Sequence, residues 1–253
     1  MFSFAFFTLN RIEGGKLFTM AKLSIIIPIY NEENTLREAI KKVEGVSLVG
    51  GLEKEIILVE DASSDRTGEI VEDYTGREGF RVIKHKNNKG KGASVIDGMK
   101  AATGDFLIIQ DADLEYEPED YNRLLPKLIS REAEVVYGSR FLSEGSRKKM
   151  FFSQYWSNRI LTGLSNLMTG MRLTDMETCY KAMTGEVARE IAEKLTSERF
   201  GIEPEITSLV KKYRVKEVPI SYFGRGKKEG KKIRAVDGLA AIWQIIWFNF
   251  RNR

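Results

Sequence analysis

The sequence predicts an α/β fold built on a mostly parallel sheet that is flanked by helices. From residue 23 to residue 137, short β-branched runs alternate with stretches of helical periodicity, which indicates successive βαβ units. The runs are apolar on both faces, as expected of strands buried in a parallel sheet. A chain of 253 residues, 42% of them hydrophobic, is long enough for one such domain with its own core.

Five strands are expected in this stretch. The first, Ser24–Ile29, leads to a helix that Asn31 is predicted to cap and whose apolar stripe begins at Leu36. The second leads to a helix capped by Ser64 or Asp65. The other four strands are expected at residues 55–59, 81–83, 105–109 and 134–137. In the C-terminal half we expect a helix at residues 186–195 and a strand at residues 216–222.

Composition excludes several classes of protein. The net charge of +4 comes from 40 basic and 36 acidic residues that nearly cancel, so no nucleic-acid partner is expected. The lone Cys179 has no disulfide partner, and with His85 as the single histidine the chain lacks a usual zinc site. A reducing cytosol and a metal bound by oxygen ligands are therefore predicted. No apolar run reaches the roughly eighteen residues of a membrane span.

Polar motifs follow the first four strands. Ligands of open parallel sheets bind beyond the carboxyl ends of the strands, so these motifs are expected to converge at one edge of the sheet. They occupy residues 30–33, 60–65, 88–92 and 111–115.

Asp111 and Asp113 come directly after the apolar fourth strand. Alternate residues of an extended chain point to the same side, so both carboxylates can share a divalent ion. Hard oxygen ligands suit Mg²⁺ or Mn²⁺, and such an ion can neutralise a diphosphate leaving group. The competing interpretation is a polar loop that caps the next helix.

Asp61 follows the second strand, where a carboxylate commonly accepts hydrogen bonds from a ribose or a base. The alternative is that this segment caps the next helix through Ser63, Ser64 or Asp65, and the two roles can coexist because Asp65 can cap while Asp61 contacts the ligand. Pro28, Tyr30 and Glu32 are expected to line the same nucleotide pocket, Tyr30 by stacking; a structural turn is the other interpretation.

Two further segments bring positive charge to this edge. The loop Asn88–Gly92 places Lys91 and flexible backbone at a helix N-terminus, which suits an anion, although the spacing of a Walker loop is absent. Arg140 follows the fifth strand, and its planar fork suits a phosphate. A plain loop and a structural ion pair are the respective alternatives.

The C-terminal half carries two charged segments. Asp175 and Glu177 lie in a turn-rich region, where either can serve as a base, position an acceptor, or simply be solvated. The stretch Tyr222–Lys232 is basic and rich in glycine, which suits a loop that closes over phosphates. A solvated loop or a membrane-surface patch explains it as well.

Taken in order, segments 27–32, 59–65, 88–92 and 110–113 resemble the motif series of family-2 glycosyltransferases with the GT-A fold. Within that family the chain is most similar to the dolichyl- and polyprenyl-phosphate sugar synthases, over residues 23–232. The resemblance implies an inverting transfer of a hexose from a GDP- or UDP-sugar to a polyprenyl (dolichyl) phosphate, with Mg²⁺ or Mn²⁺ as cofactor.

The resemblance also implies roles for individual residues. A lipid phosphate is already ionised, so Asp175 is expected to orient the acceptor rather than to deprotonate it. The implied metal ligands are Asp111, Asp113 and Glu115, and the implied catalytic residues are Asp113, Asp175, Arg140 and Arg225. The implied nucleotide-sugar contacts are Pro28, Tyr30, Glu32, Asp61, Lys91, Asp111, Ala112 and Asp113, and the implied acceptor-phosphate contacts are Arg140, Arg199 and Arg225.

Three segments depart from the family pattern. Glu60-Asp61-Ala62 replaces the commoner Asp-Asp-Gly, and Glu115 stands where mannose synthases often have Gln. The segment Asp175–Lys181 replaces the pattern Asp-Pro-x-Ser-Gly-Phe-Arg of many lipid-phosphate enzymes, which leaves the acceptor open.

The expected domains are an extension at residues 1–20, with Met20 as the hypothesised start, a GT-A domain at 21–232 and an amphipathic membrane-proximal tail at 233–253. Residues 21–140 form the expected nucleotide-sugar half and residues 141–232 the acceptor half. The aromatic and basic segment 150–168 and the tail are expected to hold the enzyme on the cytoplasmic face of a membrane. The alternatives are transfer to a growing glycan, a sugar nucleotidyltransferase and a non-catalytic binding protein.

Overall fold

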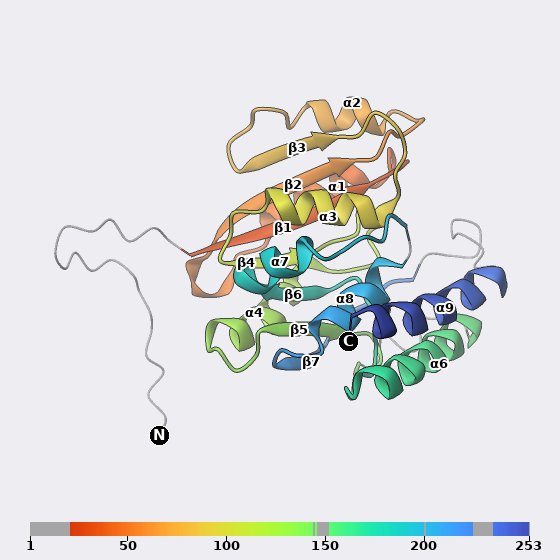
Figure 1. The fold of residues 1–253 in the computed structure, drawn as a ribbon. Coiled ribbons are helices and arrows are strands. Elements are labelled where there is room, and N and C mark those ends of the chain that lie inside the picture. The colour runs from red at the N-terminus through yellow and green to blue at the C-terminus, as the bar shows by residue number, and fades with distance from the viewer. Residues whose placement is uncertain (1–20, 144, 146–151, 200, 225–234, 253) are drawn as a thin grey trace, which may run out of the picture.

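The computed structural model describes residues 21–143, 145, 152–199, 201–224 and 235–252. These residues form one seven-stranded sheet in the order β3-β2-β1-β4-β6-β5-β7, with helices on both faces (Figure 1). The predicted extension at residues 1–20, and Arg225 with the rest of the basic stretch up to residue 232, lie outside the described residues.

The sheet is mixed but mostly parallel, as predicted. Strands β1, β2, β3 and β4 pair in parallel, β6 runs antiparallel to both β4 and β5, and β7 pairs in parallel with β5. The carboxyl ends of β1 to β5 and of β7 therefore meet at one edge. The strands are β1 (Lys22–Ile29), β2 (Glu53–Glu60), β3 (Phe80–Lys84), β4 (Phe106–Ile109), β5 (Val135–Ser139), β6 (Lys181–Thr184) and β7 (Val215–Pro219).

Helices cover both faces of the sheet. Helices α3, α7 and α8 lie in front of it in Figure 1, while α4 lies beside the α1–β2 connection, where the Asn122 amide donates to the Ser47 carbonyl at 2.9 Å. The helices are α1 (Leu36–Gly45), α2 (Thr67–Glu72), α3 (Lys91–Ala101), α4 (Tyr121–Ile129), α6 (Phe152–Thr169), α7 (Gly185–Ala192), α8 (Ile202–Val210) and α9 (Ala235–Arg251), with 3₁₀ turns η1 (Val49–Gly51) and η2 (Pro118–Asp120).

The first βαβ unit shows why the sequence forms these elements. Every residue from Leu23 to Ile27 is buried, because β1 lies in the middle of the sheet and both its faces are covered. The apolar stripe predicted for α1 is also buried, from Leu36 to Val43. The predicted cap was wrong: Asn31 has a φ of 55°, and its Oδ1 accepts from the Ser64 backbone N–H at 2.8 Å instead.

Helices α6 and α9 lie side by side beyond the β7 end of the sheet (Figure 1). The segment predicted as a short interfacial tail is the helix α9, which packs one face on the domain through Ile245 and Phe248. Its opposite face carries Trp243 and Trp247, 64% and 51% exposed. Within the described residues, no helix is both long and apolar enough to cross a bilayer.

Candidate active site

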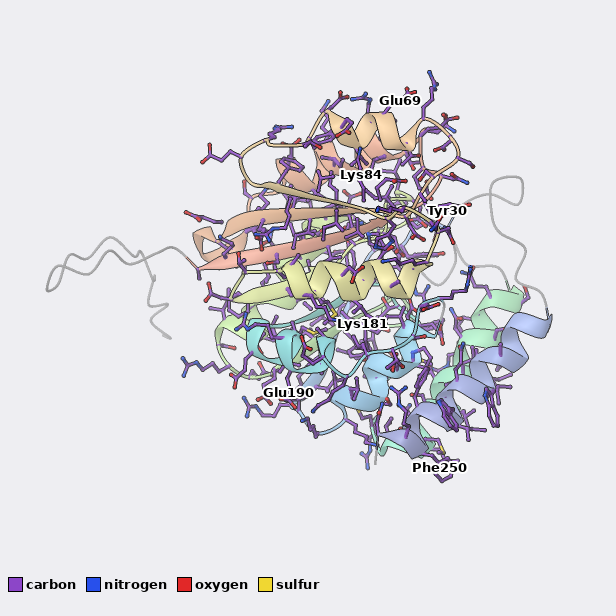
Figure 2. All side chains as sticks on the ribbon, turned by 45° about the horizontal axis from the view of Figure 1, so that its top comes forward. Tyr30, Glu69, Lys84, Lys181, Glu190 and Phe250 are labelled. Carbon is purple, nitrogen blue, oxygen red and sulfur yellow. The ribbon has the colours of Figure 1, made fainter. Side chains whose placement is uncertain are left out.

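The loops after β1, β2 and β3 are joined at the carboxyl edge by hydrogen bonds. The Asn31 backbone N–H donates to Ser63 Oγ at 3.0 Å, and the Glu32 backbone N–H donates to Thr67 Oγ1 at 2.8 Å. Tyr30 projects from this edge with 48% of its surface exposed (Figure 2). The predicted convergence of the strand-end motifs is therefore seen in the structure.

Asp61 organises the loop that follows β3. Its buried carboxylate accepts from the backbone N–H groups of Lys89 and Gly90 at 2.8 and 2.7 Å, and Oδ1 lies 2.6 Å from Nδ1 of His85. The other ring nitrogen of His85 lies 3.0 Å from Asp97 Oδ2. The backbone donors of Asn88–Gly92 predicted to bind an anion are thus partly taken up by Asp61.

The acidic pair is held by buried side chains beneath it. Gln110, at the end of β4, donates from its amide to the Asp111 carbonyl at 2.7 Å. Its amide oxygen accepts from the hydroxyls of Tyr121 and Tyr180 at 2.5 and 2.6 Å. Asp113 Oδ1 accepts from the Glu115 backbone N–H at 3.1 Å, which makes a local turn rather than the predicted alternative of a helix cap.

Lys91 brings a positive charge to the acidic pair. Its ammonium lies 2.9 Å from Asp111 Oδ1 and 3.0 Å from Glu203 Oε1, in the first turn of α8. Burial alone would lower the pKa of Lys91, but the two carboxylates hold it well above its ordinary value. Burial raises the pKa of Asp111, yet Lys91 outweighs this effect and the pKa is lowered. Both groups are therefore ionised at neutral pH.

Arg140 and Asp175 form a buried two-pronged ion pair. Nε and Nη2 of Arg140 donate to Oδ2 and Oδ1 of Asp175 at 2.7 and 2.8 Å, and the Arg140 backbone N–H adds a third bond at 3.0 Å. Glu217 holds the loop from behind, by accepting from the Thr174 and Asp175 backbone N–H groups. Both predicted functional residues are present, and the structural pairing left open by the sequence is what the structure shows.

Glu177 carries a buried oxygen that no described residue satisfies. Its Oε1 has no hydrogen-bond partner in the described part of the chain. Burial and the nearby charge of Glu203 raise the pKa of Glu177 to about 7, although Lys181 opposes this effect. The Lys181 side chain is itself buried in the centre of the domain (Figure 2).

Glu115 connects the acidic loop to α6. The Tyr222 hydroxyl donates to Glu115 Oε2 at 2.9 Å, and Gln154 in the first turn of α6 donates to the same hydroxyl at 3.3 Å. The Phe223 backbone N–H donates to the Glu115 carbonyl at 2.8 Å. Glu115 is thus tied to the start of the predicted basic loop.

The remaining predicted residues differ in position and in burial. Pro28 and Glu32 are partly exposed at the β1 end, and Ala112 is buried between the two aspartates. Arg199 is exposed and lies against the loop at Gly90, where a side-chain carbon would meet Arg199 Cγ at 2.8 Å. Arg225 lies outside the described residues.

Three residues that contact the predicted site residues were missed by sequence reasoning: Glu203, His85 and Glu217. Each is a charged or polar side chain in a segment without a recognisable motif. Glu203 is separated in sequence from its partner Lys91 by more than half of the domain, so no local pattern reports the contact. Its place in the first turn of a helix is the one available signal, and that position is common for acidic residues.

The donors around Asp111 suit Mg²⁺ or Mn²⁺. Among the described residues there is no cluster of three or more acidic, histidine or cysteine side chains that could hold a metal. Mg²⁺ commonly takes only one or two protein carboxylates and completes its shell with substrate phosphates and water. Asp111 and Asp113 offer such a set, and they fit an ion that arrives with a diphosphate better than a permanently caged one.

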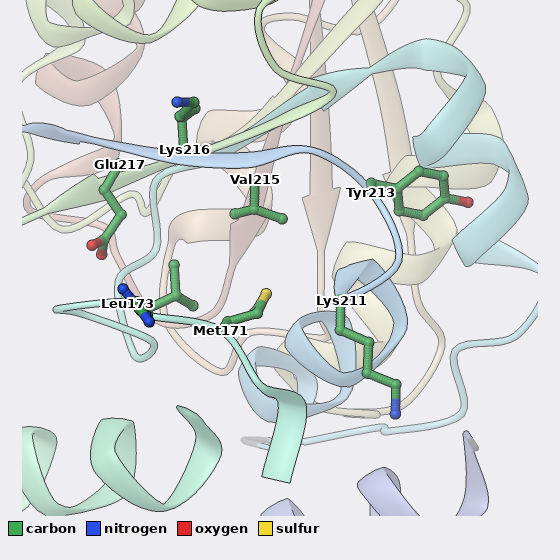
Figure 3. Close-up of a pocket in the computed structure, with 8 residues that line it drawn as sticks. Met171, Leu173, Lys211, Tyr213, Val215, Lys216 and Glu217 are labelled. Carbon is green, nitrogen blue, oxygen red and sulfur yellow. The ribbon is translucent and has the colours of Figure 1, made fainter. Parts of the chain in front are cut away.

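One pocket of about 340 Å³ lies between the α6–β6 connection and the start of β7, and Glu217 is among its lining residues (Figure 3). It is lined by Met171, Arg172, Leu173, Lys211, Tyr213, Val215, Lys216 and Glu217. Because Glu217 also holds the Asp175 loop, this pocket lies behind that loop.

Solved structures define the class of fold. Glucosyl-3-phosphoglycerate synthase of Mycobacterium tuberculosis, crystallised with Mn²⁺, UDP and phosphoglyceric acid, superposes with a TM-score of 0.63 at 20% identity, over 92% of this chain and 78% of that one. The protein therefore has the GT-A fold of nucleotide-sugar glycosyltransferases, as expected from the sequence. The model of Glycosyl transferase family 2 matches residues 24–192, and the chain belongs to this family.

Curated relatives agree with the family. An uncharacterized protein of Methanocaldococcus jannaschii is 27% identical over 94% of both chains. Dolichol-phosphate mannosyltransferase of Pyrococcus furiosus is 31% identical over 83% of this chain, which spans 59% of that protein. Undecaprenyl-phosphate 4-deoxy-4-formamido-L-arabinose transferase of Edwardsiella ictaluri is 28% identical over 84% of this chain and 63% of its own length.

Proposed function

We propose that this family-2 glycosyltransferase moves a hexose, with inversion, from a GDP- or UDP-sugar to a polyprenyl or dolichyl phosphate. The observation that carries the proposal is the acidic pair Asp111 and Asp113, with Asp61 on one side along the sheet edge and Arg140 on the other. The names of the Pyrococcus and Edwardsiella relatives, both lipid-phosphate transferases, support this acceptor class.

The donor would bind at the β1 to β4 side of the edge. Tyr30, Pro28, Glu32 and Asp61 would surround the nucleotide, and Lys91 would lie beside its diphosphate. Asp111 and Asp113, with Glu115 nearby, would hold Mg²⁺ or Mn²⁺, and a bound divalent ion supplies positive charge for the departing diphosphate. The Mn²⁺ and UDP in the Mycobacterium structure support this assignment.

The acceptor would bind at the β5 side. Asp175 binds Nε and Nη2 of Arg140, and the third guanidinium nitrogen, Nη1, would bind a phosphate oxygen. That oxygen attacks the anomeric carbon as the bond to the diphosphate breaks on the opposite face. A phosphate oxygen is already ionised, so Asp175 would fix Arg140 rather than act as a base. Arg199 and Arg225 would add positive charge for the same phosphate.

Helices α6 and α9 would rest on the cytoplasmic face of a membrane. All three tryptophans of the chain are exposed on these two helices: Trp156 at 51%, Trp243 at 64% and Trp247 at 51%. Ile160, Leu167 and Phe250 extend the two stripes, and Phe250 points away from the sheet in Figure 2. Tryptophan-rich faces of this kind suit the interface between lipid and water. The Gln154–Tyr222–Glu115 chain connects α6 to the site.

The test is a transfer assay with the full chain, Mn²⁺, a panel of GDP- and UDP-hexoses and dolichyl phosphate in vesicles. A lipid-linked hexose is expected, and Asp113→Ala should abolish it. The matched control is Asp73→Ala, which removes an exposed carboxylate paired with Arg37 and should leave transfer intact. Transfer to a soluble glycan without lipid would contradict the proposed acceptor, and release of pyrophosphate would assign a nucleotidyltransferase.

A further inference from the structure

The ammonium of Lys91 lies between two carboxylates from different parts of the fold. Asp111 reaches it from the end of β4 and Glu203 from the first turn of α8, at 2.9 and 3.0 Å. The three side chains are mostly covered, with exposures of 22% for Lys91, 21% for Asp111 and 11% for Glu203. A single cation thus bridges two carboxylates, and one negative charge of the three groups stays uncompensated.

The backbone fixes this arrangement. The Ala93 backbone N–H, at the start of α3, donates to the Glu198 carbonyl at 3.0 Å. A side-chain carbon at Gly92 would collide with the Ser197 carbonyl, so only glycine permits this approach. The α3 start, which carries Lys91, is therefore held against the segment that leads into α8, which carries Glu203. The distance between Lys91 and Glu203 is set by packing and not by the ion pair alone.

A divalent ion and the Lys91 ammonium compete for Asp111. Both are cations, and at adjacent positions in a partly buried site they repel each other strongly. The ammonium already contacts Oδ1 of the carboxylate that the metal would use, so the two cations would lie close together on one side chain. A metal at Asp111 would therefore weaken the contact between Asp111 and the ammonium, and Glu203 is the carboxylate already in place to keep the ammonium.

We propose that Lys91 stands in for the metal on Asp111 in the ligand-free enzyme, and that Glu203 is a positioning residue that retains the ammonium when the metal binds. The inference rests on the metal assignment in the proposed function. It means that the free protein binds Mn²⁺ weakly. A nucleoside diphosphate adds negative charge that attracts both cations, so Mn²⁺ binding tightens when the diphosphate is present.

Two substitutions should shift Mn²⁺ affinity in opposite directions. The measurement is the Kd for Mn²⁺ without nucleotide, obtained from the electron paramagnetic resonance signal of free Mn²⁺. Lys91→Met removes the competing cation, and the Kd is expected to fall by about tenfold. Glu203→Gln leaves Asp111 as the one carboxylate that contacts Lys91 among the described residues, and the Kd is expected to rise. Lys100→Met, an exposed lysine near the end of the same helix, is the matched control and should change nothing.

A merely structural ion pair predicts a different pattern, because both substitutions would then loosen the site and weaken Mn²⁺ binding together. An unchanged or raised Kd in Lys91→Met would overturn the inference. If Lys91→Met does not fold, the double variant Lys91→Met/Glu203→Gln keeps the summed charge and carries the same test. Its Mn²⁺ affinity should be at least that of the wild type, and a weaker affinity would overturn the inference.

Failure of the proposed metal site would look different. In that case the wild type would not bind Mn²⁺ even with saturating UDP or GDP, or Asp113→Ala would leave the Kd for Mn²⁺ unchanged. Either result would contradict both proposals. If the wild type binds Mn²⁺ through Asp113 and only the Lys91 and Glu203 variants fail to shift the Kd, the inference alone is wrong.

Discussion

Arg140 and Asp175 bind each other through two parallel hydrogen bonds at 2.7 and 2.8 Å, in a part of the domain where Asp175 has no exposed surface. Burial would lower the pKa of Arg140, but Asp175 holds it well above its ordinary value. Removing one member of such a pair leaves an uncompensated charge, whereas exchanging both members costs less. The pair is therefore a structural element as well as a proposed phosphate site.

We predict that Arg140→Ala lowers the free energy of unfolding by about 3–5 kcal/mol in urea titrations. The double variant Arg140→Met/Asp175→Asn should lose less free energy of unfolding, because neither member of the pair is then charged. The amide oxygen introduced at position 175 can still accept from the backbone N–H of residue 140. If Arg140→Ala instead keeps wild-type stability and loses only transfer activity, the pair has no structural role and the guanidinium serves the phosphate alone.

The raised pKa of Glu177 predicts a pH-dependent stability. Burial favours the protonated form in the folded state, so the folded pKa of about 7 exceeds the ordinary value of 4.5. Between these two values the folded protein binds more protons than the unfolded chain, and stability therefore declines as the pH rises from 4.5 to 7. Below this window both states are protonated, and above it the full cost is present.

Glu177→Gln removes this cost. We expect it to stabilise the protein by about 1–2 kcal/mol at pH 8, a value discounted because the residue is partly exposed, and the gain should vanish toward pH 4.5. The measurement is the Tm from pH 4.5 to pH 9. Glu186→Gln, at an exposed position on α7, is the matched control. A gain that is equal at every pH would show that charge at Glu177 is not its cause.

The sequence predicted the parallel half of the fold because β1 to β4 are continuous apolar runs that end in polar motifs. It missed β6, whose four residues Lys181–Thr184 are too few to show a period, and α4, which contains Pro126. Asn31 was placed at a helix cap because capping is local, while its amide oxygen in fact binds Ser64 from the next loop. Contacts between distant segments leave no local pattern.

The same limit applies to the site. The pair Asp111 and Asp113 was evident because spacing and strand position are properties of one segment. That Lys91 contacts Asp111 and Glu203, and that Arg140 is paired with Asp175, depends on how five separate segments pack. Sequence reasoning therefore named most of the charged groups but not their partners.

The exposed tryptophans of α9 predict membrane binding. Trp243→Ser/Trp247→Ser should weaken sedimentation with vesicles of 70% neutral and 30% anionic lipid by about tenfold or more, because two large apolar side chains no longer enter the interface. Transfer to a short, water-soluble prenyl phosphate should be unchanged. Ile129→Ser, at the exposed end of α4, is the matched control. Unchanged sedimentation would contradict membrane binding through the tryptophans of α9. If the wild type is a dimer and the double variant is a monomer, this face of α9 would instead be assigned to self-association.

The contacts of the Asp61 carboxylate indicate whether this residue holds the loop or binds a ligand. It accepts from Lys89 N–H, from Gly90 N–H and, at 2.6 Å, lies against His85. In Asp61→Asn one oxygen becomes an amide that cannot accept, so at least one buried N–H loses its partner, at a cost of about 1–3 kcal/mol.

If Asp61 holds the loop, Asp61→Asn should raise amide hydrogen exchange at residues 88–93 in the free protein, before any nucleotide is added. Asp97→Asn, which touches the far side of His85 and, at 3.6 Å, the Lys89 ammonium but no backbone N–H of this loop, should raise it less. A residue that serves only the nucleotide would behave differently, since exchange in the free protein would stay at the wild-type rate and only the Kd for the nucleoside diphosphate would rise. Because the three bonds already occupy the carboxylate, we expect the first result.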